Sequence, residues 1–342
     1  MYTFIIQSEY FYDIIKKMLV NRGNWKEASK DEEKVDYIHV DGKYAYSRNL
    51  TLLPKSNLIN ILNEQKNYEI STKGYLFDNM RRTFPKIYKK YFPQQYTIDL
   101  NKKFPLNKKL LIKLDKNLLY VKPIYDYGGS GIRYFTNIQN LQTYLKSIQD
   151  KYLCHKKKFN KSCHYVISKD INNPLLYQDK KFHIRMYFLC TNINNKNKFY
   201  IFKNGEIFTA KSKYNPNIIS KDVLDSHGHS TTGNPVYPDS LKLKPVQLDH
   251  IHNQILHLFS YIKNIIKPRC NSKDQNCYEL FGIDIMITKD LNVKIIEINS
   301  KLEFLIPQNK IKDFIETQLS LSVDKLYPNP NPSKYHKFFD EI

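Results

Sequence analysis

Two carboxylates and one amide in the last part of the chain could together bind a hard cation. Asp284 lies among apolar residues in a segment with the pattern of a β-strand, and Glu297 and Asn299 lie in the next such segment. Burying a carboxylate is costly unless a partner compensates for it. Mg²⁺ prefers oxygen ligands, and when few of them come from the protein it usually also binds substrate phosphates. The three side chains therefore predict a Mg²⁺ site. Alternatively, they cap the end of a sheet or pair with lysines.

A β-hairpin would position these three side chains. The segments 278–287 and 293–299 have the composition of strands and are joined by a polar turn. Because side chains on a strand alternate between faces, Ile296 and Ile298 are expected on the face opposite Glu297.

A glycine-rich segment, residues 118–132, could bind phosphate. A predicted strand ends near Lys122, and the turn that follows contains Gly129 and Gly131. Glycines let backbone amides approach phosphate oxygens, and a lysine supplies positive charge. The order of residues matches neither a P-loop nor the dinucleotide-binding fingerprint. A plain loop is the alternative interpretation.

A basic strand follows in the chain. Lys181, His183 and Arg185 alternate with apolar residues, so one face of the strand is polar and basic. This face could be a cationic floor for phosphates or an acidic substrate, or simply a solvated edge. Protein kinases are disfavoured, because the H-R-D and D-F-G motifs are absent.

The composition indicates a folded protein with an anionic partner. The chain has 342 residues, 41% of them hydrophobic, and a formal net charge of +21. The charge also has a simpler explanation, since lysine is frequent throughout. No apolar stretch is long enough to cross a membrane. Five cysteines, an odd number, favour reduced thiols in a cytosol-like compartment, so we expect a cytoplasmic protein.

Periodicity and turn residues predict the elements that must position these groups. The predicted strands are 3–7, 35–40, 110–114, 118–121, 164–168, 183–190, 198–203, 206–210, 278–287 and 293–299. The predicted helices are 10–19, 58–62, 74–81, 141–151 and 246–266.

In their order and spacing, these segments resemble the tubulin–tyrosine ligase-like family, from about residue 4 to about residue 305. The segments that carry the resemblance are Arg22–Trp25, Thr72–Leu76, Phe92–Tyr96, Lys122–Ile132, Lys169–Leu176, Lys180–Arg185, Lys203–Gly205, His229–Thr232, Phe281–Asp284 and Glu297–Asn299. The family has an ATP-grasp fold. The resemblance therefore implies an α+β chain with an N-terminal α/β domain (1–90), a central subdomain (91–178), a C-terminal subdomain (179–325) and a tail (326–342). The nucleotide cleft is expected between the central and C-terminal sheets.

The resemblance also implies roles for individual residues. Those expected to bind ATP are Lys73, Lys122, Gly129, Gly131, Lys169, Ile171, Lys181 and Thr231. Those expected to bind Mg²⁺ are Asp284, Glu297 and Asn299. Those expected to act in catalysis are Arg185, Lys122 and Lys203.

The implied reaction is the ATP-dependent joining of a free amino acid to an acidic protein, such as the C-terminal tail of tubulin. Glutamate, as in polyglutamylation, is the favoured amino acid, with tyrosine and glycine as alternatives. Four places depart from the family pattern: His183 replaces an acidic residue, Lys203 an arginine and Thr232 an asparagine, and Asn299-Ser-Lys replaces the usual continuation N-x-S-P. A second hypothesis is a non-catalytic basic protein that binds nucleic acid or acidic filaments and keeps a vestigial ATP site. Because the phosphate-site lysines are present, we favour the enzyme, and nucleic acid is not the expected partner.

Overall fold

The computed structural model describes most of the chain: residues 1–29, 31–45, 50–63, 69–100, 118–124, 131–154, 164–226, 236–300, 308–331 and 339–342. The strands are β1 (Tyr2–Gln7), β2 (Trp25–Glu27), β3 (Lys34–Val40), β4 (Lys55–Ile59), β5 (Gln95–Asp99), β6 (Leu119–Pro123), β7 (Arg133–Phe135), β8 (His164–Lys169), β9 (Leu176–Tyr177), β10 (Lys180–Ile193), β11 (Lys196–Thr209), β12 (Val236–Tyr237), β13 (Asn276–Ile287), β14 (Val293–Asn299) and β15 (Phe339–Glu341). The helices are α1 (Tyr12–Val20), α4 (Tyr75–Thr83), α5 (Pro85–Tyr91), α7 (Ile138–Cys154), α8 (Lys221–Leu224), α9 (Pro245–Ile265) and α10 (Gln308–Leu321).

A large mixed sheet joins the N-terminal and C-terminal parts of the chain. Its main path runs in the order β12-β11-β10-β13-β4-β3-β1-β2, and β14 pairs with β13. Strands β1 to β4 are parallel, whereas β10, β11, β13 and β14 form antiparallel pairs. The two parts meet where β4 pairs in parallel with β13, with Ile59 opposite Cys277. The N-terminal strands therefore extend the same sheet that carries Asp284.

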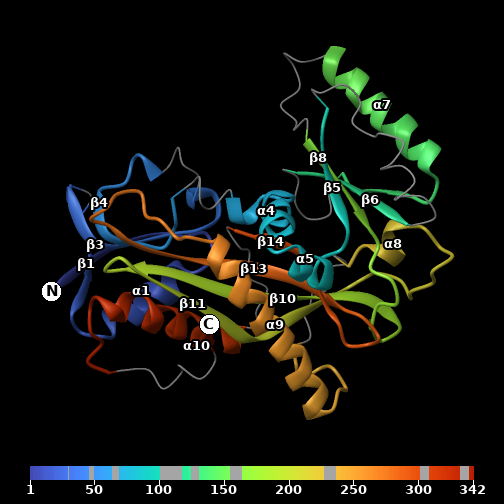
Figure 1. Cartoon of the computed structure of the whole chain (residues 1–342). Coiled ribbons are helices and arrows are strands. Elements are labelled where there is room, and N and C mark those ends of the chain that lie inside the picture. Colours follow the sequence, from blue (N-terminus) through green and yellow to red (C-terminus); the bar gives the residue numbers. More distant parts are fainter. Residues whose placement is uncertain are drawn as a thin grey trace.

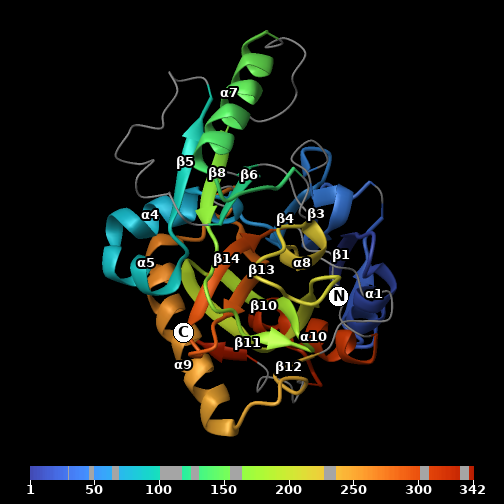
Figure 2. The ribbon, with the colours of Figure 1, turned by 90° about the vertical axis from the view of Figure 1, so that its right-hand side faces the viewer.

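A smaller sheet with a helix on it projects from the large one (Figures 1 and 2). Its order is β5-β8-β6-β7, with every pair antiparallel. Helix α7 covers one face of it through Leu141 and Leu145, which pack with Val121 and Ile167. Because alternate side chains of a strand point to opposite faces, Tyr120 and Lys122 of β6 lie on the face that α7 does not cover.

Two apolar cores lie on the two faces of the large sheet. One contains residues of α4, α5 and α9, and the other contains residues of α1 and α10. Strand β13 shows the alternation: Phe281 and Ile283 belong to the first core, and Tyr278 and Leu280 to the second. Each fully buried side chain of this kind contributes about 1.5–3 kcal/mol. By the same alternation, Asp284 lies on the face of Tyr278 and Leu280.

Most predicted elements are present, and two interpretations are wrong. The apolar run 58–62 is not a helix. Its first two residues end strand β4, which lies between β3 and β13. A short apolar run fits a buried parallel strand as well as a helix, so periodicity cannot separate the two. The predicted strands 198–203 and 206–210 form the single strand β11. The predicted strand 110–114 lies outside the described residues.

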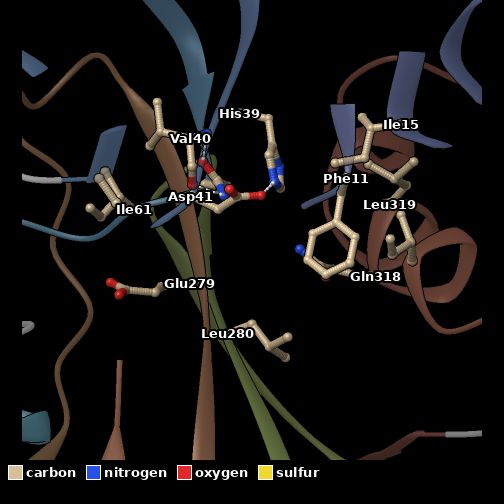
Figure 3. Close-up of a pocket in the computed structure, with 13 residues that line it drawn as sticks. Phe11, Ile15, His39, Val40, Asp41, Ile61, Glu279, Leu280, Gln318 and Leu319 are labelled. Carbon is tan, nitrogen blue, oxygen red and sulfur yellow. Dashed lines mark hydrogen bonds and ion pairs between the residues drawn. The ribbon is translucent and has the colours of Figure 1, made fainter. Parts of the chain in front are cut away.

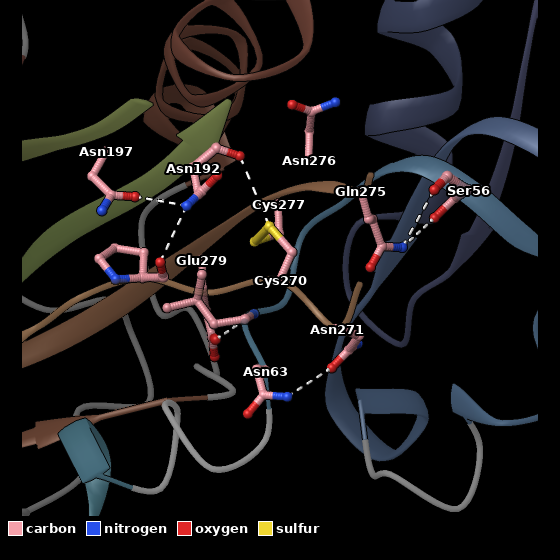
Figure 4. Close-up of a disulfide and its surroundings, with 12 residues drawn as sticks. Ser56, Asn63, Asn192, Asn197, Cys270, Asn271, Gln275, Asn276, Cys277 and Glu279 are labelled. Atoms are coloured by element: carbon pink, nitrogen blue, oxygen red, sulfur yellow. Dashed lines mark hydrogen bonds between the residues drawn. A yellow bond between two sulfur atoms is a disulfide. The ribbon is translucent and has the colours of Figure 1, made fainter. Parts of the chain in front are cut away.

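A disulfide joins Cys270 and Cys277 at the start of β13 (Figure 4). The expectation of reduced thiols is therefore wrong for this pair. Sequence spacing could not show that the loop after α9 folds back and brings the two sulfur atoms together. Cys190 is a buried free thiol, and burial raises its pKa well above the ordinary value. No helix in the described part of the chain is long and apolar enough to cross a membrane. A cytoplasmic location stays a prediction.

Candidate functional site

A cleft of about 620 Å³, part of it open to solvent, lies between the two sheets. The small sheet contributes residues of β6, β7 and β8, and the large sheet contributes residues of β10, β13 and β14. Its charged lining residues are Lys122, Lys169, Asp170, Lys181, Asp225 and Asp284. Its apolar lining residues include Ile132, Ile171, Leu224, Met286 and Ile296. A space with one apolar part and several convergent charges is typical of a ligand site.

Lys181 connects the two walls of the cleft. Its Nζ lies 2.6 Å from Oδ1 of Asp170 and donates a 2.9 Å hydrogen bond to Oη of Tyr120. Burial, and then the neighbouring carboxylate of Asp170, raise the pKa of Tyr120 well above its ordinary value. Tyr120 therefore stays neutral, and Asp170 is the anionic partner of this buried ammonium group.

Lys122 and Lys73 bring further positive charge to the same end of the cleft. Lys122 follows Tyr120 by two residues on β6, so both side chains point into the cleft. Burial lowers the pKa of Lys122, although the carboxylate of Glu297 acts in the opposite direction. Nζ of Lys73 lies 3.7 Å from Oε2 of Glu297. A dense group of lysines at one point suits a polyanionic ligand.

Four charged residues form one row across neighbouring strands of the large sheet. The Cα positions pair in the order Glu206, Arg185, Asp284 and Glu297, on β11, β10, β13 and β14. Arg185 grips Asp284 with two hydrogen bonds, from Nε to Oδ1 and from Nη2 to Oδ2, the second at 2.9 Å. Such bidentate pairs are stronger than neutral hydrogen bonds and have a defined geometry.

The predicted metal ligands lie within hydrogen-bonding distance of one another. Nδ2 of Asn299 donates to Oδ2 of Asp284 at 3.2 Å and to Oε1 of Glu297 at 3.0 Å. The hairpin that carries them is irregular, because the register shifts after the pair of Asp284 and Glu297. Ile296 consequently lines the cleft, whereas Ile298 belongs to the core. The expectation that Ile296 and Ile298 share one face is therefore wrong, because simple alternation does not hold across a bulge.

The donor set fits a divalent metal ion. Two carboxylates and one amide that converge at hydrogen-bonding distance can present hard oxygen ligands to Mg²⁺, once the amide of Asn299 turns its oxygen inward. Among the described residues, no group of three or more His, Cys, Asp and Glu side chains is arranged to bind a metal. The site therefore depends on the amide as its third ligand and suits a metal that also binds ligand oxygens.

His183 is a buried part of the cleft wall. Its ring stacks on Phe208 of β11, with ring centroids 5.0 Å apart and planes 3° apart. Nδ1 forms a 2.7 Å hydrogen bond with Oγ of Ser226, and Nε2 lies 3.8 Å from Oδ1 of Asp284. The imidazole is thus held beside the carboxylate that Arg185 grips.

Not every predicted site residue reaches the cleft. Nζ of Lys203 lies 2.8 Å from Oδ1 of Asp340, and His252 of α9 pairs with the same carboxylate. This pairing places Lys203 on the α9 side of the sheet, away from Arg185. Lys169 and Ile171 line the cleft, and Gly131 has a positive φ of 71° that glycine adopts without strain. The predicted ligands Gly129 and Thr231, and the replaced position Thr232, lie outside the described residues.

Sequence reasoning missed several residues that line or support the cleft. Tyr120 and Asp170 were visible in principle, because Tyr120 shares the face of Lys122 and Asp170 follows Lys169 directly. Glu206 also has a sequence signal, since it is a carboxylate within an apolar strand. Ser226 had no signal, because only tertiary folding brings its segment to His183.

A second hollow, part of it open to solvent, lies at the carboxyl ends of β3 and β4, under helices α1 and α10 (Figure 3). The chain itself supplies hydrogen-bond partners for most of its polar groups, and Nε2 of His39 lies 3.6 Å from Oδ2 of Asp41. Asp41 accepts hydrogen bonds from Ser8 Oγ and from the backbone N–H of Glu9, and Nδ1 of His39 is bonded to Oη of Tyr37. These contacts hold the first helix against the sheet, and we assign them a structural role.

Comparisons with known proteins identify the family of this chain. The model of the Tubulin-tyrosine ligase family matches residues 52–234 and 236–319. A probable tubulin–tyrosine ligase of Schizosaccharomyces pombe is 25% identical over 239 residues, which are 61% of this chain and 58% of the relative. A probable alpha-tubulin polyglutamylase of Tetrahymena thermophila, Ttll1, is 26% identical over 220 residues, which are 59% of this chain and 52% of the relative. The matches thus span less than two thirds of these relatives' own length.

A solved structure has the same fold. The C-terminal domain of K. lactis Pby1, described as an ATP-grasp enzyme interacting with the mRNA decapping enzyme Dcp2, superposes with a TM-score of 0.68. The match covers 99% of this chain and 98% of that domain, at 22% sequence identity. The predicted α+β ATP-grasp fold is therefore confirmed.

Proposed function

Because the chain belongs to the tubulin-tyrosine ligase family, we propose that it is an ATP-dependent ligase that joins a free amino acid to an acidic protein. The observation that carries this proposal is the convergence of phosphate-binding and metal-binding side chains in one cleft. Lys122, Lys181 and Asp284 line it, and Lys73 reaches Glu297 at its edge. Separate parts of the sequence supply these groups, so their meeting is a property of the fold.

The two parts of the cleft suit the two parts of ATP. The apolar side chains of Ile171, Met286 and Ile296 can contact the flat base. Lys73, Lys122 and Lys181 then offset the charge of the phosphates. Asp284, Glu297 and Asn299 would hold Mg²⁺, which when bound would neutralise charge on the phosphate oxygens.

The proposed reaction has two steps. The acceptor carboxylate attacks the γ-phosphorus of ATP, forming an acyl-phosphate and releasing ADP. The amine of the free amino acid then attacks the acyl carbon, which forms an amide and releases phosphate. The lysines bring two anionic reactants together, and the N–H groups of Arg185 that its protein carboxylate leaves unused can donate to the acceptor carboxylate or the acyl-phosphate. Lys203 has no part in this scheme, because its partner is Asp340.

The charge of the whole chain supports an acidic acceptor. A net charge of +21 attracts acidic polypeptides, and the C-terminal tail of tubulin is our candidate. Glutamate is the favoured amino acid, since several relatives are named for glutamylation, and tyrosine and glycine are the alternatives because other relatives are named for adding those. The imidazole of His183, stacked on Phe208, stands in the cleft wall where the family pattern has an acidic side chain.

The experiment that tests the function is amino acid incorporation. The purified chain is incubated with Mg-ATP, each radiolabelled amino acid in turn, and acidic proteins that include tubulin. We expect label on one acceptor with the wild type, and none with Lys122→Ala or Glu297→Gln. Lys203→Ala serves as the matched control and should keep activity, because it changes a lysine of the neighbouring strand outside the cleft.

Two negative outcomes would point to different corrections. ATP binding without incorporation into any acceptor would leave the nucleotide site standing and exclude the proposed acceptors. Binding of nucleic acid with a steep salt dependence, unaffected by Mg-ATP, would instead favour the non-catalytic alternative.

A further inference from the structure

Protein groups already engage all four carboxylate oxygens of the candidate metal site. Arg185 donates to both oxygens of Asp284. Asn299 donates to one oxygen of Asp284 and one of Glu297, and Lys73 pairs with the other oxygen of Glu297. Asp284 is buried, so its charge has little access to water and depends on these partners. A divalent ion bound to Asp284 would lie next to this buried guanidinium, so charge repulsion opposes its binding unless the guanidinium moves away.

A second carboxylate, that of Glu206, lies on the strand on the other side of Arg185. The Cα of Arg185 is directly opposite Asp284 on β13 and directly opposite Glu206 on β11. Directly opposed side chains on one face have their Cβ atoms about 4.5–5.5 Å apart, within reach of an arginine. Glu206 is buried and accepts a hydrogen bond from Oη of Tyr187. A buried carboxylate next to Arg185 has no part in the scheme above.

We propose that the guanidinium of Arg185 prevents free divalent ions from binding to Asp284. When the metal arrives with the nucleotide, this guanidinium moves from Asp284 to Glu206. Glu206 is then a positioning residue, and Mg²⁺ enters the site only together with ATP. This inference rests on the proposed function of the cleft, because it assigns the order in which the ligands bind.

The charges explain why the nucleotide is required. A free Mg²⁺ ion would have to displace Arg185 and the ammonium group of Lys73 and would leave two cations close to a third. The triphosphate brings negative oxygens that give Lys73 a new partner. Arg185 cannot remain buried without a counter-ion, since breaking one side of a buried pair is strongly destabilising. Glu206 supplies that counter-ion one strand away, so the guanidinium moves without crossing the cleft.

Metal binding tests the proposal directly. Mn²⁺ serves as the probe, and its binding to the full chain is measured by electron paramagnetic resonance and calorimetry. Each measurement is made once without nucleotide and once with the β,γ-imido analogue of ATP. For the wild type we expect Mn²⁺ to bind at least roughly tenfold more weakly without the nucleotide, in line with loss of a charged hydrogen-bonded pair. Arg185→Met should remove this difference by raising the affinity without nucleotide.

Glu206→Gln isolates the second position, because it keeps the shape and one acceptor oxygen for Tyr187. It should weaken Mn²⁺ binding with the nucleotide and leave binding without nucleotide unchanged. Lys203→Met is the matched control, a cation lost from the neighbouring strand but from the other face, and should behave as the wild type. If Arg185→Met does not fold, Arg185→Lys carries the test, since an ammonium group cannot grip both oxygens.

Two results would overturn the proposal. If the Arg185 variants bind Mn²⁺ without nucleotide as weakly as the wild type does, Arg185 does not hinder metal binding to Asp284. If Glu206→Gln binds Mn²⁺ with the nucleotide as tightly as the wild type does, the guanidinium does not move to Glu206. If the wild type binds no nucleotide at all, the proposed function fails. The Mn²⁺ affinities of the wild type and Arg185→Met, measured without nucleotide, would still show whether Arg185 hinders metal binding to Asp284.

Discussion

Lys181 of the large sheet and Asp170 at the end of β8 in the small sheet form an ion pair across the cleft, with a distance of 2.6 Å between Nζ and Oδ1. Both side chains are largely buried, at 3% and 11% exposed. The contribution of a buried ion pair to the free energy of unfolding depends on whether both charges are present. Removing one partner leaves an uncompensated buried charge. The pair therefore links the position of the small sheet to the stability of the site.

Loss of Asp170 should destabilise the protein more than loss of both partners. We expect Asp170→Ala to lower the free energy of unfolding by about 3 kcal/mol, because it leaves Lys181 buried and unpaired. The double variant Asp170→Leu with Lys181→Met should recover most of this loss. Urea unfolding followed by circular dichroism measures both. Lys213→Ala, which breaks an exposed pair with Asp179, is the control and should cost under about 1 kcal/mol. A double variant as unstable as Asp170→Ala would show that the charges contribute little by themselves.

Nucleotide affinity should separate the lysines of the cleft from the lysine outside it. Lys122→Ala should weaken ATP binding by roughly tenfold or more, since a charged contact to phosphate is lost. Lys203→Ala should bind ATP as the wild type does, because its ammonium group pairs with Asp340. Calorimetry with Mg-ATP compares the two variants. Equal losses in both would mean that the effect is one of overall charge and not of position.

The disulfide should stabilise the fold by closing a short loop. Cys270 and Cys277 are seven residues apart, for which loop-closure entropy predicts about 2 kcal/mol. We expect the variant with both cysteines changed to serine to lose this amount in urea unfolding. Dithiothreitol should cause the same loss in the wild type and no further loss in the variant. Equal stability of the oxidised and reduced wild type would argue against the bond as a stabilising element.

Asp324 should give the stability a distinct pH dependence. It pairs with the buried Arg22, yet burial raises its pKa to about 6, from an ordinary value of 3.8. Between these values the folded chain binds more protons than the unfolded chain, so this stabilising contribution is lost as pH rises from about 4 to 6. Asp324→Asn should therefore gain stability relative to the wild type as pH rises from 4 to 7, on the order of 2 kcal/mol.

Thermal or urea unfolding at several pH values measures this difference. The fluorescence of Trp25, the only tryptophan of the chain, is a suitable probe because its ring packs against Tyr327, near Asp324. Asp274→Asn, which removes a carboxylate at an exposed position, is the matched control. If Asp324→Asn instead lost stability relative to the wild type as pH rises, pairing with Arg22 would outweigh burial in its effect on the pKa of Asp324.

The sequence alone was sufficient for several long elements, but not for α10 or for the continuity of β11, and it was sufficient for the identity of the main chemical groups. Local patterns determine these, since the alternation in β10 and the helical spacing in α9 are visible within a few residues. Asp284, Glu297 and Asn299 stand out because a polar side chain in an apolar strand needs a partner. The run 58–62 was misread because a buried parallel strand and a helix share the same short apolar pattern.

Only the tertiary structure decided which of these groups meet. The partnership of Lys181 with Asp170, the separation of Lys203 from the cleft, and the disulfide depend on contacts between distant segments. The face of Ile296 depends on a bulge, whose position follows from pairing with β13. Glu206 became part of the site only when the register placed it beside Arg185. The physical reason is that periodicity reports the face of an element, whereas register and packing determine what that face contacts.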